Sequence, residues 1–450
     1  MSKLPDAAQD RDGREEDGDR MSPGARREKY ASAREAFEEL LRLQFTSIEA
    51  LSATQAAGTA ALVSHAIRNV PFYQSRLDML LGAGGDVDLA KWLDVPVLTR
   101  AELVSQAEAL KAVALPAAHG TTRVARSSGT SGGQVEVLRS ELQDTISACV
   151  QMRFWHDCKL DYANNLGMVR ALDPNAGIGR KSNPEAVRWG PTWLPYAERG
   201  VRRIISVHSP LDRQLEWLNG LAPVYLHTMP SNLVALAHHV RDHGGDVSGI
   251  KGAITGGEVL TDDIRAEARK WLGLEAFDSL ASAECGLMAT NCPDGGGCYH
   301  IQAELAVVEV LKPDGGPCRP GETGLLTVTP LYGFATPLIR YQSDDWVKVG
   351  EMCRCGRSLP VIAEILGRDR HLLRFADGTR LKLEPESAEI FRHLGPRRWQ
   401  IAQTALDRIT VRVADARCDQ PADFDAMAAY VGQLIGRDMN IECSFVPVLG

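Results

Sequence analysis

The stretch that most constrains this chain is residues 126–134, RSSGTSGGQ, which contains three glycines and four hydroxyl residues. It follows residues 121–125, which are typical of a short strand. Such a run can bend back on itself and point backbone N–H groups and hydroxyls at one centre, as binding a phosphate requires. It does not end in the GKS or GKT of a Walker loop. A solvent-exposed linker is the alternative interpretation, so the meaning of the run depends on the rest of the chain.

Length and composition indicate a globular protein with more than one domain. The chain has 450 residues, of which 44% are hydrophobic and 24% are charged. A formal charge of −8 without a basic cluster argues against nucleic-acid binding. Because the sequence contains no apolar run of membrane-spanning length and no secretory signal, we expect a cytoplasmic protein without membrane contact. In a reducing compartment, its ten cysteines are expected to be free thiols or metal ligands.

The pattern of apolar residues divides the chain into three parts. Residues 1–23 are charged and almost devoid of large apolar side chains, so we expect a disordered tail. Residues 24–367 begin with two amphipathic helices, continue with helices that alternate with β-branched runs, and end with strands separated by turns. Residues 368–450 predict a small α+β domain. The fold class is therefore α/β, with a large multi-layer amino-terminal domain that includes a β-rich subdomain, and a small carboxyl-terminal α+β domain.

Several motifs follow one another in an order that resembles the phenylacetate:CoA ligase family, a branch of the adenylate-forming ligases. The resemblance covers roughly residues 65–410, through VPFYQSRL, VPVLTRAEL, SSGTSGG, MPSNLVALA, TGGEVL, ASAECG, CPDGGGCYHIQAE, PGETGLLTV, PLIRYQSDD and CRCGRSLPVIAEILGR. It implies that residues 24–367 form the adenylate-forming domain. It also implies that the protein uses ATP to activate a carboxylic acid as acyl-AMP and then transfers the acyl group to coenzyme A or an amine. The expected acid is an aryl acid. A subgroup linked to capsular polysaccharide loci looks similar in its departures from the family pattern.

The resemblance also implies a role for individual residues. The ATP phosphates would be held by Ser127, Ser128, Gly129, Thr130, Ser131 and Gly132. The adenine would lie against Gly256, Gly257 and Glu258, where glycine allows the backbone to approach the ring.

Three charged residues receive catalytic or binding roles from the same resemblance. Glu284 would help to hold Mg²⁺, a cation that prefers carboxylate oxygens. Asp345 would accept hydrogen bonds from both ribose hydroxyls. Arg368, at the junction with the terminal domain, would contact ribose or phosphate, and we predict Glu284 and Arg368 as the catalytic residues. A solvated surface acid is the ordinary alternative for Glu284 and Asp345.

Some positions depart from the family pattern. Gly133 and Gln134 replace the lysine and proline that commonly continue the loop, and Leu280 begins a Leu-Ala pair where the family has an aromatic residue followed by glycine. After Lys382 the chain has no lysine, so the carboxyl-terminal catalytic lysine of many relatives has no counterpart. A cation that assists adenylation must therefore be an arginine, an upstream lysine or a metal. Two alternatives stay open: a nucleotide-independent acyltransferase or condensing enzyme on the same fold, and a non-catalytic, zinc-stabilised scaffold.

Cysteines and a histidine late in the large domain suggest a metal site. Cys353 and Cys355 form a compact two-thiolate unit, and Cys292 and His300 lie upstream in the strand-rich region. These four ligands would complete a closed, structural Zn²⁺ site, as in relatives with the same pattern. Cys298 competes with Cys292 for one position, and free buried thiols are the alternative interpretation.

The implied partners are small molecules: ATP, a carboxylic acid, and coenzyme A or an amine. Because relatives are often dimers, the resemblance is compatible with a homodimer. We consider His208, His227 and Trp155 as candidates for the acid pocket, although a packed or surface role is more usual for each.

Overall fold

The computed structural model describes residues 23–82, 84–126, 135–170, 188–294, 297–369, 372–383, 385–395, 397, 399–414 and 421–447. The predicted tail up to residue 22 and the predicted phosphate loop, Ser127–Gly132, lie outside these ranges. Within them, no helix is both long and apolar enough to cross a membrane.

Two long helices open the described chain, as the apolar spacing predicted. They are α2 (Pro23–Leu43) and α3 (Ile48–Asn69). Ser47 caps α3 by accepting a hydrogen bond from the N–H of Ala50. Val70, which precedes a proline, has φ −122° and ends the helix, because a residue before proline avoids the helical region.

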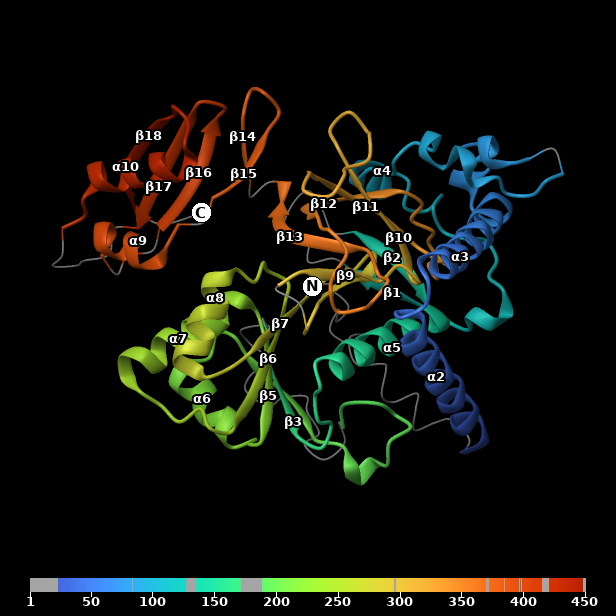
Figure 1. The fold of residues 1–450 in the computed structure, drawn as a ribbon, viewed down its shortest axis with the longest axis horizontal. Helices are drawn as coiled ribbons and strands as arrows, with labels where there is room; N and C mark the ends of the chain where they lie inside the picture. Colours follow the sequence, from blue (N-terminus) through green and yellow to red (C-terminus); the bar gives the residue numbers. More distant parts are fainter. Residues whose placement is uncertain are drawn as a thin grey trace, which may run out of the picture.

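The parallel strands predicted in the middle of the chain form one half of a large sheet. They are β3 (Asn165–Arg170), β4 (Arg202–Ser206), β5 (Val224–Thr228), β6 (Ile250–Gly256) and β7 (Ala276–Ser282). Three helices cover one face of this half (Figure 1): α6 (Leu211–Asn219), α7 (Pro230–His243) and α8 (Asp262–Glu267). Alternation of strand and helix along the sequence therefore gave the expected parallel arrangement.

The strand-rich region that follows is the other half of the same sheet. Its strands are β8 (Gly286–Asn291), β9 (Tyr299–Ile301), β10 (Ala306–Leu311), β11 (Thr323–Pro330), β12 (Tyr341–Val349) and β13 (Val361–Arg368). The complete order is β10-β11-β12-β13-β9-β8-β7-β6-β5-β3-β4, eleven strands in all. We predicted a distinct antiparallel region, and its strands are antiparallel, but β8 pairs with β7 and makes the sheet continuous.

The large domain also contains smaller helices and strands. A hairpin of β1 (Thr122–Arg126) and β2 (Glu136–Ser140) flanks the predicted phosphate loop, and α5 (Glu141–Asp157) follows it. The helix predicted near residue 100 is α4 (Arg100–Ser105). Short helical turns occupy Pro71–Tyr73, Asp78–Leu80, Leu89–Asp94, Ala117–His119, Tyr196–Glu198 and Ala268–Leu272.

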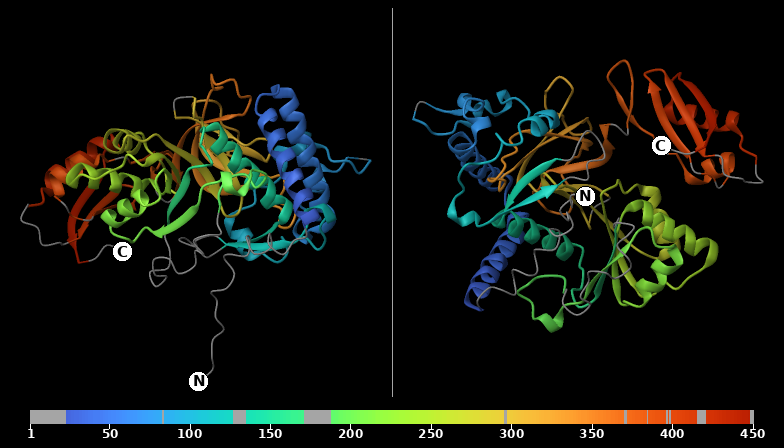
Figure 2. Two further views of the ribbon diagram at one scale, coloured as in Figure 1. Left: turned by 90° about the horizontal axis from the view of Figure 1, so that it is seen from below. Right: turned by 180° about the vertical axis from the view of Figure 1, so that it is seen from behind.

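The last part of the chain packs around a core of its own. Its elements are β14 (Leu372–Arg374), β15 (Arg380–Lys382), α9 (Ser387–Leu394), β16 (Trp399–Ala405), β17 (Arg408–Ala414), α10 (Phe424–Ile435) and β18 (Asn440–Val446). Figures 1 and 2 show these elements, in orange and red, at the opposite end of the molecule from α2 and α3. Because this core draws its residues from Leu373 onward, it supports the predicted boundary after residue 367, which stays a prediction.

Candidate nucleotide and acid site

Glu284 lies in the turn between β7 and β8, where the sheet changes from parallel to antiparallel. Its side chain is only 8% exposed, and its Oε1 atom accepts a hydrogen bond from Nη1 of Arg100 at 3.3 Å. Within the described part of the chain, the second carboxylate oxygen of Glu284 has no hydrogen bond. This acid is therefore not the solvated surface group that an isolated glutamate usually is.

The segment before α4 explains why Arg100 reaches this acid. Leu98 lies beside β12 as a short extra strand: its N–H donates to the carbonyl of Arg340 and its own carbonyl accepts from Gln342, both at 2.9 Å. Thr99 then caps α4 in a capping box with Glu102, each side chain bonding the backbone of the other residue. The motif VPVLTR thus fixes the start of α4 against β12.

Asp345 and Arg368 face each other across neighbouring strands. They are direct partners in the register of β12 and β13, and Nε of Arg368 lies 3.8 Å from Oδ1 of Asp345. The Asp345 N–H donates to Oγ of Ser343 at 3.2 Å. Burial raises the pKa of the Asp345 carboxyl; Arg368 and Ser343 oppose this, while the charges of Asp344 and Glu284 add to it.

The charge of Glu284 acts on the carboxyl group of Asp345, although 60 residues lie between the two in the sequence. Besides the effect of Glu284 on Asp345, both acids raise the pKa of the buried Cys285 thiol, after burial itself. Glu284 likewise adds to the effect of burial in raising the pKa of Tyr341, at the start of β12. The β7–β8 turn and β12 therefore present two carboxylates to the same region.

The predicted adenine segment lies at the carboxyl end of β6. Gly256 pairs with Ser279 of β7, and Gly257 has φ +86° with open space where a Cβ would stand. The Glu258 carboxylate accepts the N–H and the hydroxyl of Ser231, at 2.9 and 3.0 Å, in the first turn of α7. The hydrogen bonds with Ser231 thus hold the Glu258 side chain against α7. A flat ring could instead approach the backbone of Gly256 and Gly257. Their role at adenine stays a prediction.

Two arginines near the β7–β8 turn were missed by sequence reasoning. One is Arg100, and the other is Arg139 of β2, which is almost fully buried and donates to Asp144 and Ser147 at 2.8 Å each. The Arg139 guanidinium lies 3.5 Å from the position that a Cβ on Gly286 would take. The loop lysine that the family carries is absent here, but cationic groups do stand near the acid.

Four sulfur and nitrogen donors cluster at the β8–β9 connection and the segment before β13. The donor atoms of Cys292, Cys298, His300 and Cys353 all lie within 4.8 Å of one another. The Sγ atom of Cys353 is 3.8 Å from that of Cys292 and 3.8 Å from that of Cys298. Tetrahedral zinc with Zn–S bonds of about 2.3 Å requires sulfur atoms about 3.8 Å apart, so the geometry fits Zn²⁺.

The predicted fourth ligand, Cys355, lies next to this set rather than in it. Its Sγ is 3.2 Å from Nε2 of His300. The Nδ1 atom of His300 faces the carbonyl of Leu359 at 3.4 Å, the contact that usually orients a metal-binding imidazole. Cys298 therefore lies beside Cys353 together with Cys292, and does not take the place of Cys292. With the adjacent Cys355, five donor side chains surround a site that needs four. Which four bind stays a prediction.

The candidates for the acid pocket differ in their surroundings. His227, in β5, has a shielded Nδ1 atom without a hydrogen-bond partner among the described residues, and Nε1 of Trp155 is in the same situation. Trp155 packs edge-on against Trp189, with ring centroids 5.3 Å apart. His208 follows β4, and its N–H donates to the hydroxyl of Ser206 at 3.2 Å.

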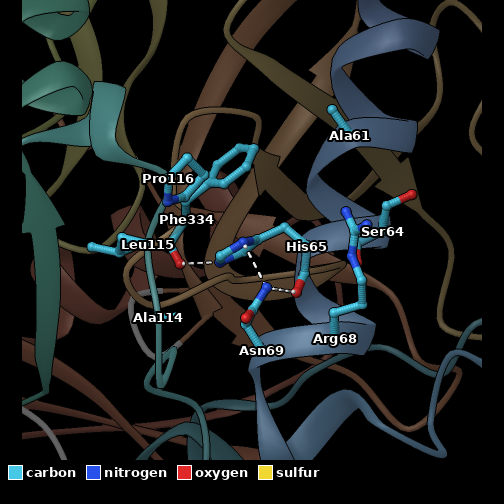
Figure 3. A pocket seen from close by; sticks show the side chains of 9 residues that line it. All are labelled: Ala61, Ser64, His65, Arg68, Asn69, Ala114, Leu115, Pro116 and Phe334. Carbon is cyan, nitrogen blue, oxygen red and sulfur yellow. Dashed lines mark hydrogen bonds between the residues drawn. The ribbon is translucent and has the colours of Figure 1, made fainter.

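A separate recess of about 540 Å³ lies between α3 and residues 114–116 (Figure 3). At its base, Nε2 of His65 lies 3.0 Å from the carbonyl of Phe334, and the Asn69 amide lies 3.2 Å from Nδ1 of His65. None of the predicted site residues that the structure describes lines this recess, and its histidine is satisfied by neighbours. The recess is therefore separate from the candidate nucleotide and acid site.

Comparison with solved structures defines the class of fold. A crystal structure of 2-hydroxyisobutyryl-CoA ligase in the postadenylation state matches with a TM-score of 0.65 and 17% identity, over 91% of this chain and 89% of that one. ATP-bound MatB from Rhodopseudomonas palustris matches with a TM-score of 0.51 and 16% identity, over 73% and 64%. The fold is that of the adenylate-forming ligases, which confirms the predicted fold class.

Sequence comparison gives the nearer relation. The chain is 25% identical to phenylacetate-coenzyme A ligase of Escherichia coli (strain K12) over 392 residues, which are 82% of this chain and 84% of that enzyme. It is 30% identical to phenylacetate-coenzyme A ligase of Thermus thermophilus over 168 residues, a match that spans 36% of this chain and 38% of that enzyme. No family model matches. The resemblance to phenylacetate:CoA ligases is thus confirmed, whereas the capsular subgroup stays a prediction.

Proposed function

We propose that this protein uses ATP to convert a carboxylic acid to acyl-AMP, with release of pyrophosphate, and then transfers the acyl group to coenzyme A. The observation that carries the proposal is the convergence of Glu284 and Asp345 on one region, with Arg368 facing Asp345. The matched relatives are named as coenzyme A ligases, and another structural neighbour holds 2-HIB-AMP together with coenzyme A at a TM-score of 0.58.

The described residues suit the parts of such a reaction. The Asp345 carboxylate can accept hydrogen bonds from two ribose hydroxyls, and ionic hydrogen bonds of this kind are strong where water is scarce. Arg368 balances that carboxylate and ends β13, where the chain passes to the terminal elements. Reaction at a phosphate depends mainly on positioning and electrostatic stabilisation, so no protein nucleophile is required.

The free oxygen of Glu284 fits Mg²⁺, which takes carboxylate ligands in nucleotide sites. Arg100 holds the other oxygen and so orients the carboxylate. When bound, the ion supplies positive charge to the phosphates. Arg100 adds charge beside Glu284, and Arg139, which pairs with Asp144, lies against Gly286 at the end of the same turn; the chain lacks the lysine of the family loop.

We propose further that the thiolate cluster holds a structural Zn²⁺ and that the acid is aryl. Protein donors fill every position around the metal, so none is left for substrate. Phe154, Trp189, Tyr225 and Phe277 form a buried aromatic core on the other face of the parallel strands, and the aryl nature of the acid rests on the names of the matched relatives. Cytoplasmic residence, transfer to an amine and a homodimer stay predictions.

Pyrophosphate exchange into ATP, measured with magnesium and a panel of carboxylic acids, tests the proposal. Exchange with any acid is the expected result. Asp345→Asn should lower the exchange rate about 100-fold, the usual effect of losing one well-placed polar contact in such a site. Asp344→Asn is the matched control, because Asp344 is exposed on the other side of the strand. Consumption of a thioester without ATP would instead indicate the acyltransferase alternative, and a folded, zinc-containing protein inactive in both assays would indicate a scaffold.

A further inference from the structure

The carboxyl ends of β3 and β5 form the point at which the order of the parallel strands reverses. The sheet runs β4-β3-β5, so the chain leaves β3 on one side and returns on the other. In open α/β sheets, ligands bind in the crevice at such a point, outside the carboxyl ends of the strands. The residues that face this crevice therefore bear on what the protein binds.

Arg170 and His227 lie on one face of the sheet at this crevice. His227 is the register partner of Met168, and Arg170 follows Met168 by two positions, so alternation places all three on one face. Met168 belongs to the aromatic core of that face, together with Tyr225. The opposite face, with Val169, is covered by α6–α8. Arg170 and His227 thus stand at the carboxyl ends of their strands, on the same face as this buried aromatic core.

The charge of Arg170 acts on the neighbouring imidazole of His227. Burial, followed by the charge of Arg170, lowers the pKa of His227 to about 4, so its imidazole is neutral at pH 7 and its shielded Nδ1 lacks a partner among the described residues. Burial and the neighbouring Arg202 lower the pKa of Arg170. The structure gives Arg170 no carboxylate partner in the ranges it describes, although part of its side chain is open to solvent. Arg170 is thus an exposed cation without a counter-charge in those ranges, and it lies beside a buried imidazole that lacks a partner there, so these strand ends are suited to a ligand that brings a negative charge.

We propose that Arg170 and His227 bind a second carboxylate of the substrate, so that the acid to be activated is a dicarboxylic acid. Arg170 would donate from its guanidinium to the carboxylate, and His227 would donate from Nδ1 in its neutral form. The inference deepens the proposed function and rests on it for the reaction, but binding of the diacid can be measured without ATP.

Calorimetry without nucleotide tests the proposal directly. Aliphatic and aromatic diacids, each paired with the monoacid that lacks one carboxylate, are titrated into the full-length protein. We expect the best diacid to bind about 10- to 100-fold more tightly than its monoacid, the effect of one ionic hydrogen-bonded contact. Arg170→Gln should abolish this preference and leave monoacid binding unchanged, while Arg170→Lys should keep part of it.

Arg203→Gln is the matched control. Arg203 is a residue of the same type on the neighbouring strand, but it pairs with Gly167 and therefore belongs to the opposite face. This variant should retain the diacid preference. Equal binding of diacids and monoacids by the wild-type protein, or equal weakening of both by Arg170→Gln, would overturn the inference.

Pyrophosphate exchange with the same acids separates this inference from the proposed function. Exchange that favours monoacids leaves the ligase function standing and contradicts the diacid subsite. Tight diacid binding that Arg170→Gln abolishes, without exchange for any acid, supports the subsite and contradicts the ligase function.

Discussion

Arg340 and Asp345 show how a single motif can contain residues with different purposes. Both lie in PLIRYQSDD, one of the motifs that carry the family resemblance, in which only Asp345 received a predicted role. In the structure, Arg340 is 3% exposed and donates to both carboxylate oxygens of Glu309, at 2.9 and 3.0 Å, and to the carbonyl of Leu93 at 2.8 Å. Arg340 thus ties the segment before α4 to β10, whereas Asp345 faces Arg368 across β12 and β13. The two side chains differ in burial, because Arg340 is enclosed by segments that are distant from it in the sequence.

Arg340→Met should therefore lower stability rather than act directly on nucleotide binding. The change leaves the Glu309 carboxylate buried beside Trp92 without its counter-charge, and breaking a buried pair in this way costs about 3–5 kcal/mol. Urea denaturation measures the loss. Arg269→Ala is the control, since the exposed pair of Arg269 with Glu275 should contribute at most about 1 kcal/mol. Similar losses for both variants would contradict this account.

Among the elements, local signals predicted the boundaries well. Thr261, a residue type that favours N-caps, caps α8, and the turn that follows ends at Gly273, whose φ of +67° suits glycine. Pro230 opens α7 at its first position. What the sequence could not predict was the pairing of distant segments, such as the continuity of the sheet through β7 and β8. For the same reason it supplied candidate ligands for zinc but not the contacts that bring Cys298 beside Cys353.

The start of α4 illustrates how a local signal supports a distant site. Thr99→Ala removes a cap and should lower stability by about 1 kcal/mol. Because α4 carries Arg100, the variant should also weaken its contact with Glu284 and lower the rate of pyrophosphate exchange several-fold. Thr99→Ser keeps the hydroxyl and should preserve both properties. Thermal unfolding and the exchange assay provide the measurements, and an exchange rate unaffected by Thr99→Ala would argue against this coupling.

The cluster of Cys292, Cys298, His300 and Cys353 joins two loops, so removal of a metal bound there should destabilise both loops. We expect one zinc per chain by elemental analysis, and chelation should lower the melting temperature. Cys353→Ser should abolish zinc binding, because Cys353 contacts both upstream thiols. Cys298→Ser and Cys355→Ser decide the fourth ligand: we expect the first to release zinc and the second to retain it. Cys318→Ser, whose thiol donates to a backbone carbonyl outside the cluster, is the control. Full zinc content in Cys353→Ser would exclude this site.

For the molecule as a whole, two buried histidines link stability to pH. His65 and His119 pack on either side of Phe334, with ring centroids 4.6 and 4.3 Å from its ring. Burial lowers the pKa of both; the Phe334 carbonyl partly opposes this for His65, and the charge of His65 adds to it for His119. Below the ordinary histidine pKa of about 6.5, the unfolded chain therefore binds more protons than the folded one. Stability is fully present above that pH and declines as the pH falls.

Replacing both histidines by glutamine should remove their share of this pH dependence and leave that of the buried His227 in place. The His65→Gln/His119→Gln double variant should be less stable than wild type at pH 8, because packing around Phe334 is disturbed. Between pH 7.5 and 5, however, its loss of stability should be smaller, because glutamine does not titrate and the two lowered histidine pKa values no longer favour protonation of the unfolded chain. Thermal unfolding at several pH values measures the two slopes. His243→Gln, at an exposed position of α7, should follow the wild-type slope. Parallel curves for the double variant and the wild type would place the acid sensitivity elsewhere in the chain.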